Sequence, residues 1–383
     1  MSRVRAVLCL KEGVMKIAVL GAGSVAQAVA FYLSKNSLVK SFICVDKSAE
    51  NLEKCQKYSG KKGTMCHRDI TNKLDLLLTL KRCDGVINTL PYAFLTETTR
   101  LCIVSEKHMI DLGGNNNVIA NQRCMERLAK DFGVTIVPAC GLAPGIISDI
   151  AYDAKRILDE TEMIKMFCGG LPKHPSGELM HGLFFNEEGL YNEYAEKPEI
   201  IIDNSFKIVQ FLTPTEDVQF KNPRFSALLE SAMTHGAFSP DKKIWGEVKT
   251  VFYSTLRYPG HFAKVRGMIT KLSREECVRQ FKEKLAPAGD DLVALRVLAS
   301  GNVDGRPAEY ACEFVDFCDE KTGLTAMQRS TGFPAAEVAL QILENPTKWP
   351  KGVVAHEPYV DMQKMRKEMK KMGICVYSSL KLL

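Results

Sequence analysis

The sequence lacks any apolar run that approaches the roughly 18 residues of a membrane-spanning helix, so we expect no segment that crosses a bilayer. The N-terminal stretch MSRVRAVLCLKEGV has a short apolar core, but it has no small-residue cleavage site, and Lys11 and Glu12 interrupt it. A secretory signal is therefore not expected, and residues 1–14 are expected to form a frayed extension before the first strand. These absences favour a cytoplasmic protein.

The thirteen cysteines include no CxxC pair and no Cys/His spacing typical of metal ligands, so no metal site is expected. They are scattered among apolar residues, which favours reduced, buried thiols over a disulfide framework. Cys140 and Cys168 border motifs described below, but no histidine is adjacent to either, and packed thiols are favoured over nucleophiles. The net charge of +6 is spread along the chain. Without a basic stripe interleaved with aromatic residues, no nucleic-acid partner is expected.

The 383 residues are enough for two domains. Over residues 1–145, strand patterns such as KIAVLGAG, SFICVD and DGVINTL alternate with helical segments at short intervals, which is typical of a parallel sheet covered by helices. After this point the pattern changes to scattered strand-like pieces and longer loops. We predict an α/β protein with an N-terminal Rossmann dinucleotide-binding domain at 1–145, a second, mixed α+β domain at 146–325, and C-terminal helices at 326–383.

Two helical patterns are expected near the C-terminus. The segment FPAAEVALQILEN has an apolar face of 3.6-residue period and opens with Pro334 near its first turn. The segment DMQKMRKEMKKMGI is basic and has methionines at three- and four-residue spacing. Such a helix can bind a partner or a membrane surface, but docking of the methionine stripe on the chain's own body is the favoured interpretation.

The hexapeptide GAGSVA follows the first apolar strand and opens a helix. Gly21 permits a tight turn, Gly23 lets the backbone approach a pyrophosphate, and Ala26 lets helix and strand pack closely. The second strand ends in Asp46, where a carboxylate can accept hydrogen bonds from ribose hydroxyls. Because it would repel a 2′-phosphate, Asp46 favours NAD over NADP, and the adjacent Lys47 could blunt that preference. The alternative is a Rossmann-like domain that binds no dinucleotide.

Ligands of open parallel sheets bind at the carboxyl ends of the strands. The segments NTLPY, DLGG and ACGLAPG stand at those ends. Beyond the residues just named, the predicted cofactor contacts are Ser24, Val25, Thr89, Leu90, Pro91, Asp111, Leu112, Leu142 and Ala143.

The segment STLRYPGHF places Arg257, Tyr258 and His261 beside a Pro-Gly bend. A turn needs only the proline and the glycine. The three polar side chains therefore indicate either a solvated corner or a pocket wall that holds something small and charged.

Four segments occur in a characteristic order, namely ACGLAPG, CGGLPKHP, TLRYPGH and STGFPAA. With them the chain resembles the saccharopine dehydrogenase-like superfamily from about residue 15 to about residue 345, and within it the L-lysine 6-dehydrogenases more than the saccharopine reductases. The resemblance implies a Rossmann domain, a mixed domain that binds substrate and dimerises, and a C-terminal helix that packs back toward the nucleotide domain. It thus implies a homodimer or a higher homo-oligomer.

The resemblance also implies the contacts of a small amino-acid substrate, which fall on Gly113, Gly114, Phe185, Thr255, Leu256 and Arg257. Arg257 would bind the α-carboxylate, for which a planar guanidinium is suited. Two departures from saccharopine reductases are Ala143 in place of an aspartate and Glu188 in place of an arginine. Because a site for saccharopine must hold three carboxylates, these departures favour lysine as the substrate.

The implied reaction is the NAD-dependent oxidation of the ε-amine-bearing carbon of L-lysine to allysine, with release of ammonia. The amine must be neutral before the hydride leaves, so a base is required. The candidates are His261, His181, Asp111 and Tyr258, with His261 first because imidazole titrates near neutral pH. One alternative is a saccharopine- or carboxyspermidine-type reductase that forms or cleaves a secondary amine. Another is a non-catalytic, NAD-sensing Rossmann protein.

Overall fold

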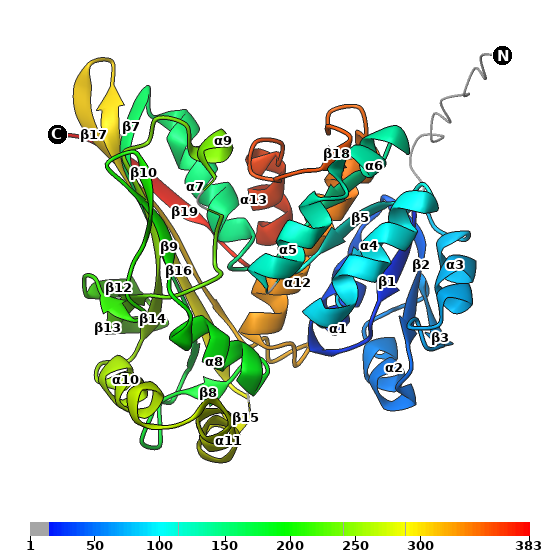
Figure 1. Cartoon of the computed structure of the whole chain (residues 1–383), viewed down its shortest axis with the longest axis horizontal. Helices are drawn as coiled ribbons and strands as arrows, with labels where there is room; N and C mark the ends of the chain where they lie inside the picture. Colours follow the sequence, from blue (N-terminus) through cyan, green and yellow to red (C-terminus); the bar gives the residue numbers. More distant parts are fainter. Residues whose placement is uncertain (1–14, 114, 240, 288) are drawn as a thin grey trace.

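The computed structural model describes residues 15–383 apart from 114, 240 and 288. The predicted extension at 1–14 and the predicted substrate contact Gly114 lie outside the described residues. Figure 1 shows two bodies, one blue to cyan and one green to yellow, with the orange and red C-terminal helices between them. None of the described helices is long and apolar enough to span a membrane.

The first body is built on a parallel sheet, as predicted for an α/β fold. Its described strands run in the order β18-β6-β5-β4-β1-β2-β3, and every pair is parallel. Two of them are not among the expected strands, because β3 is a half-exposed edge strand without a continuous apolar run and β18 has only two residues. The strands are β1 (Met15–Leu20), β2 (Val39–Asp46), β3 (Gly63–His67), β4 (Gly85–Asn88), β5 (His108–Asp111), β6 (Thr135–Val137) and β18 (Gly352–Val353).

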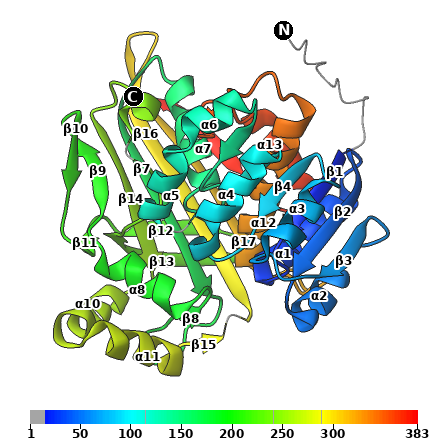
Figure 2. The ribbon, with the colours of Figure 1, turned by 45° about the vertical axis from the view of Figure 1, so that its right-hand side comes forward.

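Helices cover both faces of this sheet (Figure 2). An apolar cluster fills the space between the sheet and the helices on each face. One cluster includes residues of α1, α2 and α12, and the other includes residues of α3, α4 and α6. Ser48 and Asn72 cap α2 and α3 with their side-chain oxygens, as the composition of helix N-termini leads one to expect. The helices are α1 (Ser24–Lys35), α2 (Ala49–Gln56), α3 (Lys73–Leu80), the 3-10 turn η1 (Tyr92–Phe94), α4 (Leu95–Val104), α5 (Asn116–Arg123) and α6 (Glu126–Asp131).

The second body is a mixed sheet, as predicted. Its main path of described strands is β10-β9-β14-β7-β16-β17-β19, and β13 joins β14 to β11 and β12. Strands β14 and β7 are parallel, whereas β16 pairs with β7 and β17 in long antiparallel ladders. The strands are β7 (Glu160–Pro172), β9 (Glu199–Ile202), β10 (Ser205–Ile208), β11 (Thr213–Pro214), β12 (Val218–Asn222), β13 (Phe225–Met233), β14 (Thr250–Arg257), β16 (Asp291–Val303), β17 (Arg306–Phe317) and β19 (Tyr377–Leu382), with β8 (Gly182–Leu183) and β15 (Ala286–Pro287) forming a separate pair.

Helices α7, α12 and α13 lie between the two sheets and join them. Helix α7 packs on β7 and β16, and α12 packs on α1, β4, β5 and β16. In Figure 1, α8, α10 and α11 lie at the lower end of the second sheet, whereas α9 lies near its upper end beside α7. The helices of this half are α7 (Ile146–Ile157), α8 (Glu187–Ala195), α9 (Lys242–Trp245), α10 (His261–Lys271), α11 (Arg274–Lys284), α12 (Ala326–Glu344) and α13 (Met362–Lys371).

Helix α12 begins earlier than its apolar pattern indicates. The Thr325 hydroxyl accepts a hydrogen bond from the Gln328 amide, and the Gln328 side chain accepts one from the Thr325 amide. This capping box starts the helix at Ala326, so Pro334 lies inside it and not in its first turn. A side chain at Gly332 would come within 2.9 Å of the Ala28 side chain, which shows how closely α12 approaches α1.

The rest of the C-terminal region divides between the two bodies. Met362, Met365 and Met369 of α13 are buried against the chain's own core, which confirms the docking interpretation of the methionine stripe. Strand β18 joins the first sheet through β6, but β19 pairs with β17 in the second sheet. The segment 326–383 is therefore not a set of helices on the Rossmann side alone.

Candidate active site

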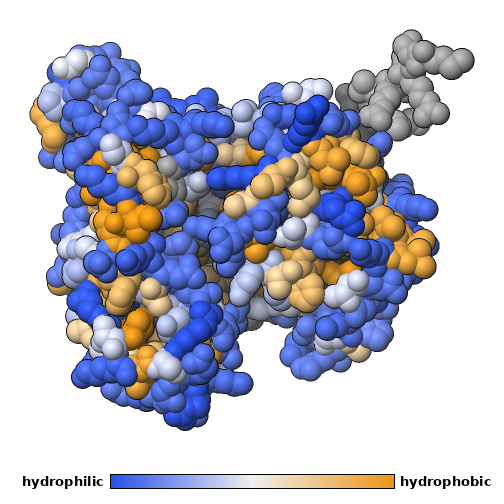
Figure 3. Space-filling view, in the orientation of Figure 1, coloured by the Kyte–Doolittle hydropathy of each residue, from blue (hydrophilic) through white to orange (hydrophobic). Residues whose placement is uncertain are grey.

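A large cleft lies between the two bodies. It has a volume of about 590 Å³ and is lined by the carboxyl ends of the first sheet, the start of α1, the loop 139–145, α8, and the ends of β7 and β14. The space-filling view shows the two halves parted at one end of the molecule (Figure 3). The cleft is thus at the edge where parallel sheets bind their ligands.

The loop between β1 and α1, which contains Gly21 and Gly23 and is called the glycine loop below, leaves space for a ligand at the start of α1. Gly21 has φ +94°, and a side chain there would come within 2.8 Å of the Thr89 hydroxyl. At Gly23, in contrast, an added Cβ meets no described protein atom within 4 Å. Gly23 is the N-cap of α1 and no described side chain caps this helix, so its first amides stay open to an anion. The packing role predicted for Ala26 agrees with its full burial.

Asp46 closes β2 beside this loop. Its Oδ2 accepts a hydrogen bond from the Ala22 amide (2.7 Å) and its Oδ1 accepts one from the Ser48 amide (2.8 Å). The two bonds fix the carboxylate at the cleft wall, where each oxygen keeps further lone pairs for ribose hydroxyls. Lys47 is exposed and is not among the described residues that line the cleft. The space at Gly23, the uncapped helix and Asp46 together fit a dinucleotide.

The predicted cofactor contacts divide into two groups. Ser24, Ala26 and Lys47 are not among the described lining residues, nor is Asp111. Those that do line the cleft are Gly21, Gly23, Val25, Asp46, Thr89, Leu90, Pro91, Leu112, Leu142 and Ala143.

Asp111 holds a loop beneath the cleft surface. One oxygen accepts hydrogen bonds from the amides of Gly113 (2.8 Å) and Ala139 (3.2 Å), and the other accepts one from Gln122 (2.6 Å). Burial raises the pKa of Asp111, although these hydrogen bonds oppose the shift. Because Asp111 is fully buried and binds the amides of Gly113 and Ala139, it shapes the turn that presents Leu112 and Gly113.

Arg257, the last residue of β14, forms part of the substrate-side wall. It is only 3% exposed and lines the cleft. Its Nε donates to the Tyr194 hydroxyl (2.6 Å), its Nη1 to the Leu256 carbonyl (2.8 Å) and its Nη2 to Glu193 (3.3 Å). Of the two interpretations of this segment, the pocket wall is the one that the structure supports for Arg257.

His261 holds Arg257 indirectly, because both side chains form a hydrogen bond with the Tyr194 hydroxyl. Its Nδ1 lies 2.8 Å from the Leu179 carbonyl, which can only accept, so Nδ1 carries the proton and Nε2 accepts from the Tyr194 hydroxyl at 3.0 Å. Burial and the nearby Arg257 lower the pKa of His261 to about 3. The imidazole is thus neutral, with both ring nitrogens bonded to protein, and it is not among the described lining residues.

The other two base candidates are also turned away from the cleft. The Tyr258 hydroxyl donates to the Pro172 carbonyl (2.9 Å), and burial raises its pKa to about 12. The His181 ring packs against His261 and Phe184, and neither of its nitrogens has a partner in the described structure. Burial, with Arg257 as a second cause, holds the pKa of His181 well below its ordinary value. Neither is among the described residues that line the cleft.

Of the remaining predicted substrate contacts, Gly113 and Phe185 line the cleft, but Thr255 and Leu256 do not. Both are buried in β14. The Thr255 hydroxyl donates to Glu193 (2.8 Å), and the Leu256 carbonyl holds Arg257. Thr255 and Leu256 therefore help to position Glu193 and Arg257, which do line the cleft.

Glu188 does not occupy the position that its alignment with an arginine indicates. It is exposed on α8, forms an ion pair with Arg274 at 2.5 Å, and is not among the described lining residues. The argument that Glu188 would repel a substrate carboxylate is therefore wrong, because this side chain faces α11 and solvent. Ala143, the other departure, does line the cleft.

Several polar residues that line the cleft were not predicted from the sequence, namely Glu193, Glu196 and His235. Glu193 accepts from both Thr255 and Arg257. Glu196 lies 3.0 Å from Nε2 of His235, whose Nδ1 faces the Lys197 carbonyl at 3.0 Å. These residues stand in a helix and a loop that carry no recognisable motif, so only their tertiary neighbours mark them. Cys168, also in the wall, is a packed thiol whose pKa burial raises to about 12.

The fold and the site together define a two-domain, dinucleotide-binding protein with a polar wall opposite the nucleotide loop. Residues 17–137 match the family described as Saccharopine dehydrogenase NADP binding domain, and residues 141–374 match Saccharopine dehydrogenase C-terminal domain. The chain therefore belongs to the saccharopine dehydrogenase family.

Individual relatives are distant. The chain is 23% identical over 266 residues to the mitochondrial alpha-aminoadipic semialdehyde synthase of Mus musculus, covering 66% of this chain and 28% of that protein. It is 25% identical over 276 residues to the NADP(+)-dependent, L-glutamate-forming saccharopine dehydrogenase of Pyricularia oryzae, covering 68% and 58%. The chain thus spans about a quarter of the length of the first relative and less than two thirds of the length of the second.

Two solved structures share the fold over nearly the whole chain. The apo saccharopine dehydrogenase (L-Glu forming) of Saccharomyces cerevisiae has a TM-score of 0.75 at 19% identity, covering 96% of this chain and 100% of that one. The homospermidine synthase of Legionella pneumophila, solved with NAD, has a TM-score of 0.65 at 14% identity, covering 96% and 92%.

Proposed function

We propose that the chain catalyses the NAD-dependent oxidation of the ε-amine-bearing carbon of L-lysine to the aldehyde, with release of ammonia. The charge of the cleft wall carries this proposal. Arg257 is the only lysine or arginine among the described lining residues, whereas Asp46, Glu193 and Glu196 all line the cleft. Lysine brings one carboxylate and two amines, which match this set. Saccharopine brings three carboxylates, and an unpaired buried carboxylate costs several kcal/mol.

The pair Arg257 and Glu193 would hold the α-amino-acid end. In the described structure three of the five guanidinium hydrogens are used, so Nη1 and Nη2 each keep one donor for a carboxylate. Glu193 lies beside them and would accept from the α-ammonium group. The His261–Tyr194 chain fixes the Arg257 plane, which is a positioning role for His261 in place of the predicted role as a base.

The cofactor side rests on the glycine loop and Asp46. The amides at the start of α1 would hold the pyrophosphate, and Asp46 would accept from the ribose hydroxyls. The nicotinamide, when bound, accepts the hydride. The matched family domain is described as NADP binding, but a 2′-phosphate would lie against the Asp46 carboxylate. This repulsion supports NAD as the cofactor.

Removal of the ammonium proton requires a group that faces the cleft. The four predicted bases do not, so we assign this role to the pair of His235 and Glu196. Both nitrogens of His235 face oxygens that accept, namely Glu196 and the Lys197 carbonyl. Both residues line the cleft, and the imidazole and carboxylate of the pair can accept a proton from the substrate amine.

The test is a substrate screen with the purified chain. L-lysine and saccharopine are supplied at equal concentration with NAD⁺ or NADP⁺, and absorbance at 340 nm, ammonia and glutamate are measured. We expect reduction of NAD⁺ with ammonia release from lysine. Glutamate release from saccharopine at a higher rate would overturn the proposal. Cofactor binding without turnover of any amine would instead favour an NAD-sensing protein.

A second candidate function is the oxidation or formation of a secondary amine of the saccharopine type. It is supported by the family membership and by the position of Glu188, which removes one objection to a substrate rich in carboxylates. The glutamate measurement above separates it from lysine deamination, because only a secondary amine that contains a glutamate moiety releases glutamate.

A further inference from the structure

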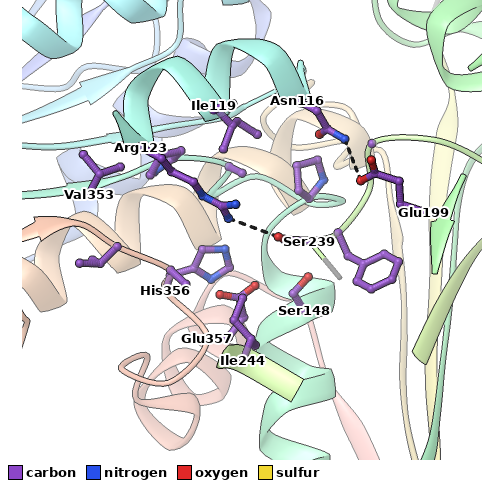
Figure 4. A pocket seen from close by; sticks show the side chains of 18 residues that line it. Asn116, Ile119, Arg123, Ser148, Glu199, Ser239, Ile244, Val353, His356 and Glu357 are labelled. Carbon is purple, nitrogen blue, oxygen red and sulfur yellow. Dashed lines mark hydrogen bonds between the residues drawn. The ribbon is translucent and has the colours of Figure 1, made fainter. Parts of the chain in front are cut away.

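A second, smaller cavity lies beside the main cleft (Figure 4). Its volume is about 160 Å³, and a cavity of roughly 150 Å³ can hold a molecule the size of benzene. Asn116, Pro144 and Gly236 line both spaces. The cavity therefore adjoins the cleft without containing the glycine loop, Arg257 or Glu193.

The cavity wall contains a buried carboxylate with an unpaired oxygen. Glu357 is 6% exposed, and its Oε2 is buried without a hydrogen-bond partner in the described structure. A buried acceptor that loses its water and gains no donor destabilises the folded protein, and more so when it is charged. A donor supplied by a ligand in the cavity would remove that destabilisation.

Neighbouring charges leave the Glu357 carboxylate uncompensated. His356 and Asp149 form a buried ion pair, with Nδ1 2.6 Å from Oδ1. Burial alone would lower the pKa of His356, but Asp149 and Glu357 raise it to about 9. At neutral pH one imidazolium thus faces two carboxylates, and one negative charge remains. Glu199 adds another acid at the wall, where it accepts from Asn116 (3.4 Å).

Arg123 is the cation on the opposite side of the cavity. In Figure 4 it enters from α5, across the open space from Glu357. It is exposed and donates one Nη2 hydrogen bond to Ser239 (3.2 Å). Within the described residues it forms no ion pair with Glu357, so the two charges face the same space from different walls.

We infer that this cavity binds a small protonated primary amine, whose ammonium group donates to Glu357. An ammonium group offers three donors and one positive charge, which fits an unpaired buried carboxylate. The amine can belong to a simple alkylamine or to an amino acid. In the second case the carboxylate of the ligand would also reach Arg123. The inference does not depend on the reaction in the main cleft.

Binding to the purified full-length chain at neutral pH tests this site. The ligands are n-butylamine, which has only the amine, and 5-aminopentanoate, which adds a carboxylate; pentanoate is the control without an amine. We expect saturable binding of both amines and none of pentanoate. Glu357→Gln keeps the side-chain shape but removes the charge, and it should raise the Kd for both amines by about tenfold or more. Arg123→Met should raise it for 5-aminopentanoate alone if the ligand is an amino acid.

Matched variants separate the two spaces. Glu193→Gln alters the main cleft and should leave amine binding to the small cavity unchanged. An unaltered Kd in Glu357→Gln, loss of binding in Glu193→Gln alone, or no saturable binding of either amine would each overturn the inference. Ile119→Phe keeps every charge and fills the cavity, so it decides the question if Glu357→Gln does not fold. Amine affinity equal to wild type in a folded Ile119→Phe protein would also overturn it.

Discussion

Replacing Gly23 by alanine tests the nucleotide site while leaving the protein fold intact. Gly23 has φ −68° and ψ −167°, an extended conformation that alanine adopts, and the added Cβ would meet no described protein atom within 4 Å. Alanine restricts the unfolded chain, which stabilises by ~0.4–1 kcal/mol, but it is a poorer N-cap than glycine by a similar amount. We expect these effects to offset, so the Tm of the protein without nucleotide should stay close to that of wild type.

The same methyl group should interfere with the cofactor. It would project into the space at the uncapped start of α1, where the pyrophosphate is proposed to approach the backbone. A phosphate displaced from these amides loses charge-assisted hydrogen bonds, and we expect NAD⁺ affinity to fall by about ten- to a hundredfold, which is ~1.4–2.8 kcal/mol.

Gly21→Ala is the matched control, because here the protein itself fills the space. The residue has φ +94°, and its Cβ would lie 2.8 Å from the Thr89 hydroxyl, which is held by a hydrogen bond to the Leu20 carbonyl. A non-glycine residue in this region costs ~1–2 kcal/mol before the contact is counted. This variant should therefore lose stability as well as affinity.

The assays are thermal unfolding without nucleotide and a fluorescence titration with NAD⁺. Wild-type affinity in a stable Gly23→Ala protein would show that the pyrophosphate does not lie at this loop. A Tm for Gly23→Ala as low as that of Gly21→Ala would show that the space beside Gly23 is not open.

Four further predictions follow from the same contacts. Asp46→Ser should raise the ratio of kcat/KM with NADP⁺ to that with NAD⁺ by about tenfold or more, and a wild-type enzyme that already prefers NADP⁺ would refute the ribose assignment. Arg257→Lys should reduce kcat/KM for lysine by the equivalent of ~2–5 kcal/mol with NAD⁺ affinity unchanged; normal lysine kinetics would remove Arg257 from the site. The folded-state pKa of His356 is about 9, above the unfolded value, so its contribution to stability is full below about pH 6.5 and is lost as pH rises toward 9, at about 1.4 kcal/mol per pH unit. In urea unfolding at several pH values, His356→Gln should lack this decline, and an equal decline in both proteins would assign it elsewhere. Glu188→Gln should leave lysine kinetics within about twofold of wild type, since loss of an exposed ion pair is worth at most ~1 kcal/mol; a large change in KM would return Glu188 to the site.

Local chemistry is what made the nucleotide half predictable. The turn at Gly21, the open approach at Gly23 and the carboxylate of Asp46 all depend on a few neighbouring residues and on strand–helix alternation, and these features are visible in sequence. The methionine stripe of α13 was predictable for the same reason, since a helical period specifies which side chains share a face. The start of α12 was misplaced because the capping box at Thr325 lies before the apolar period begins.

The substrate wall depends on contacts between residues far apart in the chain. The sequence indicated Arg257 as part of a site, but Tyr194 and Glu193, which hold it, come from α8 more than sixty positions earlier. The turn after Arg257 directs Tyr258 and His261 into protein contacts, although all three residues lie within one short segment. A local pattern specifies residue type and backbone shape, but which polar group faces the cleft depends on how β14, α8 and α10 pack. That packing decided the roles of these side chains.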